Sequence, residues 1–210
     1  MVKVKICGIC NLTDALEAYK LGADFLGFVF FQNSPRKLEP DEARLIIREL
    51  PKNVLKVGLF LDQDLNEVHA AASKCGLDFL QLHGNEDPGY CARLKKDFKI
   101  IKSFRVKDKA SVERASDYNV CDHYLFDTYV KGVPGGTGVS FDWDILTGRT
   151  FKRPIFLAGG LTPKNVGEAV TKIKPYAVDV ASGVEESPGK KNHKLLKEFI
   201  ENAKKAEFTR

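Results

Sequence analysis

The stretch Val2-Lys3-Val4-Lys5-Ile6-Cys7, followed at once by Gly8, predicts a β-strand that ends in a cysteine. A second apolar stretch, His123-Tyr124-Leu125-Phe126, lies far downstream and ends in Asp127. Ionisable groups at the carboxyl ends of two separate apolar strands are typical of an active site on a parallel α/β scaffold. The pairing of Cys7 with Asp127 therefore points to acid–base chemistry.

Short strand-like runs recur along the whole chain, with segments of helical period between them. The predicted strands are Val2–Cys7, Asp24–Phe30, Val54–Phe60, Phe79–His83, Ile100–Phe104, Tyr124–Asp127, Ile155–Ala158 and Ala177–Ala181. Strands that are apolar almost throughout belong in a parallel sheet covered by helices. Eight such units without a break in composition predict an α/β protein with one domain over residues 1–210, a compact (β/α)8 barrel.

Prolines mark the predicted starts of several helices. Pro40, Pro88 and Pro163 each stand where a helix is expected to begin, and proline is favoured in the first turn. After the sixth strand, only Phe141–Leu146 is available for a helix. A chain of 210 residues is short for this fold, so the loops must be compact.

Composition and charge narrow the class of protein. The chain has 43% apolar and 29% charged residues and a net charge of +5, as in an ordinary soluble globule. No apolar run is long enough to cross a bilayer and no signal peptide is visible, so we expect a cytoplasmic protein without a membrane partner. A dense basic stripe with interleaved aromatics is missing, which argues against nucleic-acid binding.

The parity of the first strand predicts which side chains enter the barrel. Its three apolar residues share one face and should pack on the helices, which places Lys5 and Cys7 inside. In the eighth strand, Asp179 is an isolated charge among apolar residues. Because lone charges inside a barrel need partners, we expect Lys5 to pair with Asp127 or Asp179.

Each candidate also has a structural explanation. Cys7 would serve equally well as a small buried apolar residue, and a single aspartate at a strand end such as Asp127 is commonly a helix N-cap. Gln81 and His83 share one face of the fourth strand. The structural explanation for His83 is a hydrogen bond to the carbonyl group of a loop. The joint position of these residues at strand ends favours the functional interpretation.

Glycines follow the last two strands in positions that suit a phosphate. Gly159 and Gly160 follow the seventh strand, and Ser182 and Gly183 follow the eighth. Loops after strands seven and eight form the recurrent phosphate site of this barrel, and a short helix there would direct its amino end at the anion. Ordinary tight turns are the alternative. The loop Gly132–Gly138 resembles a mobile lid, although a plain connection would look the same.

The spacing of Cys7 and Cys10 invites a redox or zinc interpretation. Zinc needs about four ligands, and no second cluster of cysteine or histidine accompanies this pair. We therefore expect no metal and no redox cofactor, and five free thiols. We interpret Cys10 as a coincidental neighbour of Cys7, and the sequence leaves open whether the two form an inactivating disulfide under oxidation.

A set of motifs recurs in a fixed order along the whole chain. They are Lys5-Ile6-Cys7-Gly8, Gly27-Phe28-Val29-Phe30, Ser34-Pro35-Arg36, Gln81-Leu82-His83-Gly84, Leu125-Phe126-Asp127, Gly135-Gly136-Thr137-Gly138, Phe141-Asp142-Trp143, Ala158-Gly159-Gly160-Leu161 and Asp179-Val180-Ala181-Ser182-Gly183-Val184-Glu185. Together they resemble the phosphoribosylanthranilate isomerase family of tryptophan biosynthesis. The resemblance implies a (β/α)8 barrel and a cofactor-free Amadori rearrangement of N-(5′-phosphoribosyl)anthranilate to 1-(2-carboxyphenylamino)-1-deoxyribulose 5-phosphate.

The resemblance also implies roles for individual residues. By motif, Cys7 resembles the general base, Asp127 the general acid, and Arg36 the residue that meets the anthranilate end. The other predicted substrate contacts are His83, Gln81, Asp179 and Lys5, and the predicted phosphate contacts are Gly136, Gly138, Gly159, Gly160, Ser182 and Gly183. The partner is then a small phosphosugar, and the chain a monomer or homodimer. Cys10, Ala181 and Asn192 depart from the residues common in the family, but none is the proposed acid or base.

Two other functions stay open at this level, one of the same class and one of a different class. Another phosphosugar barrel, such as indole-glycerol-phosphate synthase or a histidine-pathway isomerase, would keep the glycine loops; the histidine enzymes use aspartates at the ends of the first and fifth strands. Here the first strand ends in Cys7 and the fifth carries Lys102 and Phe104. A non-catalytic phosphate binder would need neither Cys7 nor Asp127.

Overall fold

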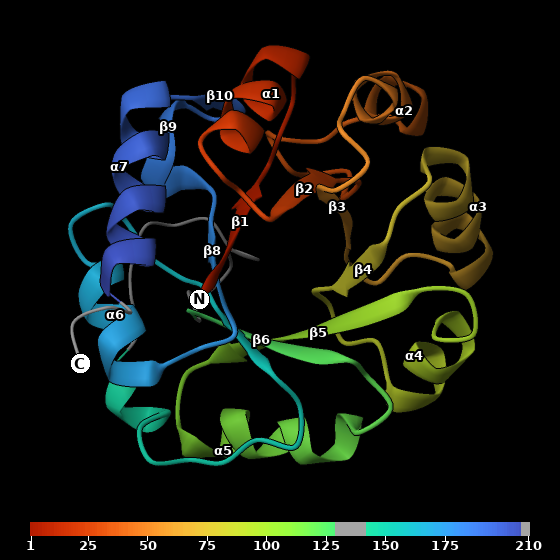
Figure 1. The fold of residues 1–210 in the computed structure, drawn as a ribbon. Coiled ribbons are helices and arrows are strands. Elements are labelled where there is room, and N and C mark those ends of the chain that lie inside the picture. The colour runs from red at the N-terminus through yellow and green to blue at the C-terminus, as the bar shows by residue number, and fades with distance from the viewer. Residues whose placement is uncertain (129–141, 207–210) are drawn as a thin grey trace.

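The computed structural model describes residues 1–128 and 142–206 and has eight parallel strands that close into a barrel (Figure 1). The strands are β1 (Lys3–Cys7), β2 (Phe25–Val29), β3 (Leu55–Phe60), β4 (Phe79–Leu82), β5 (Lys99–Val106), β6 (His123–Thr128), β7 (Ile155–Leu157) and β8 (Ala177–Val180). Because β1 pairs with both β2 and β8, the barrel has no open edge. The predicted (β/α)8 fold is confirmed.

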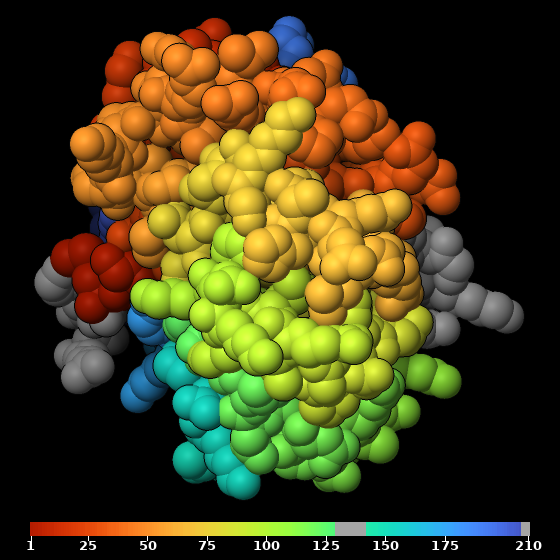
Figure 2. Space-filling model, turned by 90° about the vertical axis from the view of Figure 1, so that its right-hand side faces the viewer, coloured from red at the N-terminus to blue at the C-terminus, as the bar shows by residue number. Residues whose placement is uncertain are grey.

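Helices surround the barrel on its outside (Figure 1). They are α1 (Leu12–Lys20), α2 (Pro40–Arg48), α3 (Leu65–Cys75), α4 (Pro88–Leu94), α5 (Lys109–Glu113), α6 (Val166–Ile173) and α7 (His193–Lys205), with 3-10 turns η1 (Arg114–Tyr118), η2 (Trp143–Ile145) and η3 (Ser182–Val184). A short hairpin, β9 (Glu185–Ser187) and β10 (Lys190–Lys191), precedes α7. Figure 2 shows one side of this cover, where the colours run from orange at the top through yellow and green to cyan at the bottom, in chain order.

The helix starts predicted from proline are confirmed at two positions of three. Pro40 and Pro88 occupy the first turns of α2 and α4. The prediction for Pro163 is wrong, because α6 begins only at Val166, after a turn in which the side chain of Asn165 accepts a hydrogen bond from the N–H of Thr162 at 2.8 Å.

In the described part of the connection after β6, which starts at residue 142, the structure has a 3-10 turn, Trp143–Ile145, where the sequence predicts a helix over Phe141–Leu146. A segment this short leaves most of its backbone groups without α-helical partners, so the tighter 3-10 bonding fits it better.

The barrel interior is layered. A central apolar layer consists of Phe25, Val57, Phe79, Ile101, Leu125, Phe156, Ala158 and Ala177. The apolar residues of β1 point outward into the helix-facing core, as predicted, and Lys5 and Cys7 are not part of that core. Toward the carboxyl ends of the strands the buried interior residues are polar: Gln81, Ser103, Asp127 and Asp179 are all less than a tenth exposed. The apolar layer therefore seals the floor beneath a polar chamber.

One titratable side chain lies at the opposite end of the barrel: that of His123, the first residue of β6. Its imidazole packs against the rings of Phe79, Phe156 and Tyr176, with centroids 5.7, 5.4 and 5.1 Å away. Burial among these rings lowers the pKa of His123 from 6.5 to about 4, because it disfavours the charged imidazolium. The folded protein therefore holds this histidine neutral.

We predict that His123 makes the fold sensitive to mild acid. The unfolded chain binds more protons at His123 than the folded chain between pH 6.5 and about 4, so the free energy of unfolding should fall as the pH decreases through that window. Substitution His123→Phe should flatten this part of the profile, measured by urea unfolding at about pH 7 and about pH 5. The exposed His69 provides the control substitution His69→Phe. An unchanged slope in His123→Phe would contradict the prediction.

Candidate active site

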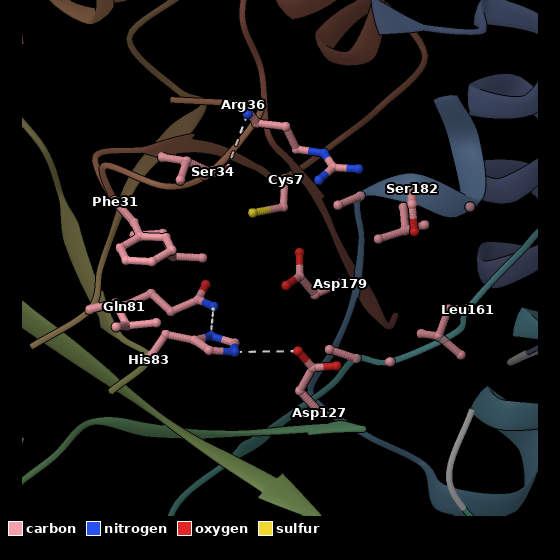
Figure 3. A pocket seen from close by; sticks show the side chains of 18 of the residues that line it. Cys7, Phe31, Ser34, Arg36, Gln81, His83, Asp127, Leu161, Asp179 and Ser182 are labelled. Atoms are coloured by element: carbon pink, nitrogen blue, oxygen red, sulfur yellow. Dashed lines mark hydrogen bonds and ion pairs between the residues drawn. The ribbon is translucent and has the colours of Figure 1, made fainter. Parts of the chain in front are cut away.

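A cavity lies at the carboxyl ends of the strands, above the apolar layer (Figure 3). Its lining includes Cys7, Arg36, Gln81, His83, Asp127, Gly159, Gly160, Asp179, Ser182 and Gly183. These are predicted site residues, and the closure of the barrel brings all of them to one place. Lys5 lies just below and is fully buried. Gly136, Gly138 and the predicted lid Gly132–Gly138 lie outside the described residues.

The thiol of Cys7 points into the cavity from the end of β1 (Figure 3). Neighbouring glycines make room for it: a Cβ on Gly27 would lie 2.9 Å from Cys7 Sγ, and one on Gly8, whose φ is +73°, would lie 2.5 Å from Cδ of Arg36. Neither position can carry a side chain without displacing a residue of the site.

Lys5 pairs with Asp179 beneath the thiol. Lys5 is on β1 and Asp179 on β8, and these two strands are neighbours in the closed barrel, with Lys5 in register with Asp179. The Nζ atom of Lys5 lies 3.0 Å from Oδ1 of Asp179. Of the two partners predicted for Lys5, the structure selects Asp179. In the close-up, Asp179 lies between Cys7 and Asp127 (Figure 3).

The same cluster determines the charge state of the thiol. Burial raises the pKa of Cys7 above its ordinary value of 9.0, and the nearby ammonium groups of Lys5 and Lys191 only partly offset this. Burial lowers the pKa of Lys5, but the Asp179 carboxylate and the sulfur of Cys7, as hydrogen-bond partner and when ionised, raise it more, so the net shift is upward and Lys5 stays charged. Cys7 is therefore a neutral thiol near neutral pH, because the Lys5 ammonium lowers its pKa by less than burial raises it.

Asp127 is held by partners on two sides at the end of β6. Its Oδ1 accepts a hydrogen bond from the N–H of Thr128 at 2.8 Å, and its Oδ2 lies 3.3 Å from Nε2 of His83. Gln81 lies 3.0 Å from the other ring nitrogen of His83, Nδ1. The side chain of His83 thus joins Gln81 to Asp127, and its neighbours are these two groups instead of a loop carbonyl.

The loops after β7 and β8 touch each other. A Cβ on Gly183 would lie 1.9 Å from the carbonyl oxygen of Leu161. Gly159 has φ +85°, and a Cβ there would lie 2.2 Å from Thr128 Oγ1 and 2.9 Å from Asp127 Oδ1. Glycine is therefore required for this packing, which brings Gly159 against Asp127 and makes the two loops one wall of the cavity.

An ion network behind the thiol was missed by sequence reasoning. Nε of Arg36 donates to Oε1 of Glu185 at 2.9 Å, and Oε1 of Glu185 also accepts from Nζ of Lys191 at 2.8 Å. The β9–β10 hairpin places Lys191 opposite Glu185. The dipeptide Pro188-Gly189, with Gly189 at φ +82°, was the one signal for this hairpin, since such pairs mark tight turns.

The cysteines and the metal-binding groups give two further observations. All five cysteines are free thiols, as predicted: Cys7, Cys10, Cys75, Cys91 and Cys121. Within residues 1–128 and 142–206, no group of three or more histidine, cysteine, aspartate or glutamate side chains could hold a metal ion. None of the helices in those two segments has the length and apolar character that crossing a bilayer requires.

A (β/α)8 barrel with ionisable side chains gathered at the carboxyl ends of its strands defines the class of this protein, and comparison with known proteins defines the family. The family model for N-(5′-phosphoribosyl)anthranilate (PRA) isomerase matches residues 4–202. The chain therefore belongs to the phosphoribosylanthranilate isomerase family.

Individual relatives agree over nearly the full length. The N-(5′-phosphoribosyl)anthranilate isomerase of Geobacter sp. (strain M21) is 50% identical, over 98% of this chain and 99% of the relative. The crystal structure of phosphoribosyl anthranilate isomerase from Thermotoga maritima superimposes with a TM-score of 0.93 at 42% identity, covering 98% of this chain and 100% of that chain. A second crystal structure of such an isomerase, in complex with reduced 1-(o-carboxyphenylamino)-1-deoxyribulose 5-phosphate, has a TM-score of 0.86 at 40% identity, with 98% and 100% coverage.

The contact between the loops after β7 and β8 leads to a prediction about the strength of phosphate binding. In Gly183→Ala the new Cβ must displace the Leu161 carbonyl, which should separate the loops and weaken phosphate binding about tenfold. Inhibition by inorganic phosphate and the KM of the phosphorylated substrate both report this change. Gly167→Ala in α6, where a Cβ would meet nothing closer than 3.8 Å, is the matched control. Equal phosphate inhibition in the two variants would rule out a phosphate site at these loops.

Proposed function

We propose that the chain catalyses the Amadori rearrangement of N-(5′-phosphoribosyl)anthranilate to 1-(2-carboxyphenylamino)-1-deoxyribulose 5-phosphate, a step of tryptophan biosynthesis, with Asp127 as general acid and Cys7 as general base. The observation that carries the proposal is that a thiol and a carboxyl group, far apart in the sequence, face one cavity of a barrel in this family. The enzyme is an isomerase of the aldose–ketose type.

The acid step opens the sugar ring. A proton passes from Asp127 to the furanose oxygen while the C1–O bond breaks and the anthranilate nitrogen supplies its lone pair to C1, which leaves an iminium ion. The Asp127 carboxylate formed in this step keeps the N–H of Thr128 on Oδ1 and faces His83 on Oδ2. Both contacts stabilise negative charge on the acid after the transfer.

The base step removes the proton from C2. The iminium ion makes this proton acidic, and the thiolate of Cys7 takes it, so that the electron pair forms the C1–C2 double bond of an enolamine and neutralises the nitrogen. Protonation at C1 with loss of the O2 proton then gives the ketone. Carbon 2 is oxidised and carbon 1 is reduced within the same molecule, so the electrons balance without a cofactor.

The remaining polar side chains are proposed to bind the substrate. Arg36 would meet the anthranilate end of the substrate: its Nε and Nη2 donate to Glu185, which holds the guanidinium plane in place at the cavity. Gln81, His83, Asp179 and Lys5 would contact or orient the sugar, and Gly159, Gly160, Ser182 and Gly183 the phosphate. Gly136 and Gly138 remain predicted phosphate contacts from sequence. The cytoplasmic location and the choice between monomer and homodimer also remain predictions.

Removing either catalytic group should abolish most turnover while preserving binding. General acid and general base steps are each worth about 10²–10⁴-fold, so Asp127→Asn and Cys7→Ser should lower kcat by about that factor. The decay of substrate fluorescence, with the substrate made in situ, measures kcat, and titration with a reduced product analogue measures binding.

The control for the thiol is Cys75→Ser, because Cys75 is buried away from the cavity and its Sγ donates to the carbonyl of Pro40, a bond that serine can also make. This variant should turn over like the wild type. A Cys7→Ser enzyme with wild-type kcat would remove Cys7 from the role of base, and an active Asp127→Asn enzyme would do the same for the acid.

The raised pKa of the thiol predicts a rising pH profile. Because burial holds the pKa of Cys7 above 9.0 in the free enzyme, the reactive thiolate fraction increases about tenfold per pH unit below that pKa. The rate at which iodoacetamide alkylates Cys7, a reaction that needs the thiolate but not the acid Asp127, should therefore climb from about pH 6 to about pH 9. The variant Cys7→Ser should show no such reaction at position 7. A flat alkylation profile in the wild-type enzyme would contradict a raised pKa of the thiol.

A further inference from the structure

Lys191 is a buried cation immediately behind Cys7. Its side chain is 0% exposed, and its Nζ donates to the carbonyl oxygen of Cys7 at 2.6 Å, to that of Ala181 at 3.2 Å and to Oε1 of Glu185 at 2.8 Å. An ammonium group has three protons, so these three acceptors use all of them. Each acceptor belongs to a different segment of the site, which makes Lys191 a junction between them.

The two carbonyl acceptors lie where the first and last strands separate. The β1–β8 register runs from Lys3 to Ile6, with Ile6 opposite Val180, so Cys7 and Ala181 would form the next pair. The backbone of Ala181, with φ −121° and ψ −82°, has already left the strand conformation. The ammonium group of Lys191 binds both carbonyls at this level, in place of the ladder. It therefore sets the spacing between Cys7 and the loop that begins with Ser182.

The third acceptor joins this junction to Arg36. The carboxylate of Glu185 receives Lys191 on Oε1 and Arg36 on both oxygens, with Nε of Arg36 2.9 Å from Oε1 and 3.1 Å from Oε2. Since a carboxylate shared by two cations holds both in place, the position of Arg36 depends on that of Lys191.

The backbone of Lys191 is itself anchored, so the junction is rigid. Its N–H donates to Oδ2 of Asp14 at 2.8 Å, and Oδ1 of the same carboxylate lies 2.8 Å from Nε2 of His193. Asp14 is buried in α1, directly after the loop that follows Cys7. Lys191 is thus held at its backbone by the helix that follows β1 and at its Nζ by the ends of β1 and β8.

We propose that Lys191 is a positioning residue for the isomerase reaction, which aligns the Cys7 thiol with the phosphate loop after β8 and couples both to Arg36. The inference rests on the proposed function, because it takes Cys7 as the base. The sugar chain fixes the distance from its phosphate to C2, so the thiol meets the C2 proton only if the ends of β1 and β8 keep their spacing. A misplacement of about 1 Å costs on the order of 10²-fold in rate.

The charge of Lys191 has a second consequence for the thiol. Burial raises the pKa of Cys7, and Lys191 is among the groups that lower it. Removing the ammonium should therefore leave Cys7 harder to ionise. This effect can be read from the chemistry of the thiol alone, without any measurement of turnover.

The test compares Lys191→Met with the wild-type protein by two readouts. Turnover gives kcat and KM, and we expect kcat to fall about 100-fold with a much smaller change in KM. Alkylation of Cys7 by iodoacetamide as a function of pH, followed by peptide mass spectrometry, gives the pKa of the thiol, which should rise. Lys190→Met is the matched control, because Lys190 is the neighbouring residue of β10 but its side chain is 64% exposed and pairs with Glu186; both readouts should match the wild type.

Two outcomes separate this inference from its alternatives. A folded Lys191→Met protein with kcat within about twofold of wild type and an unchanged alkylation profile would overturn it, even if its Tm were lower, because Lys191 would then only stabilise the fold. If Lys191→Met does not fold, Lys191→Gln, which keeps amide donors but removes the charge, carries the same two readouts. Turnover by Cys7→Ser at the wild-type rate would instead disprove the base assignment, and the alkylation profile would still test the contact between Lys191 and Cys7.

Discussion

The ion pair between Lys5 and Asp179 is the interaction on which the upper half of this barrel depends. Lys5 is fully buried, so its ammonium group requires an acceptor inside the barrel, and closure of β1 against β8 supplies Asp179 at 3.0 Å. Such a pair adds little net stability compared with an apolar packing, but loss of one partner leaves a buried charge that costs about 3–5 kcal/mol. It therefore favours the one register in which the seam between the first and last strands can close.

The thiol proposed as the base also lies at this seam between β1 and β8. Cys7 is two residues beyond Lys5 on the same face of β1, so the register that pairs Lys5 with Asp179 also brings the thiol to the rim of the cavity. Lys5 approaches the thiol from below and Lys191 from behind, and both lower its pKa against the larger effect of burial. The result is a thiol that is neutral in the resting site, with two ammonium groups nearby to stabilise the thiolate that takes the proton from carbon.

On the opposite side of the cavity, packing and hydrogen bonding define the acid. Gly159 leaves no room for a Cβ between itself and Asp127, and His83 and Thr128 occupy the two carboxylate oxygens. The central apolar layer of aromatic and aliphatic residues lies beneath all of these groups and excludes water from below. In a buried chamber, charges that develop during the reaction interact more strongly with fixed donors than they would in water. The strongest interactions between developing charges and fixed donors are therefore expected at the carboxyl ends of the strands.

The sequence by itself determined the class of fold, the inward face of β1 and the identity of the acid and base candidates, because these depend on local periodicity and on which residue ends a strand. It also narrowed the partner of Lys5 to two aspartates. Only the tertiary structure decided between Asp179 and Asp127, showed that Asp127 faces His83, and revealed the Lys191–Glu185–Arg36 network. Those contacts join residues 44 to 174 positions apart, as in His83–Asp127 and Lys5–Asp179, or lie in a hairpin with almost no periodic signal. They depend on strand register and barrel closure, which no local pattern encodes.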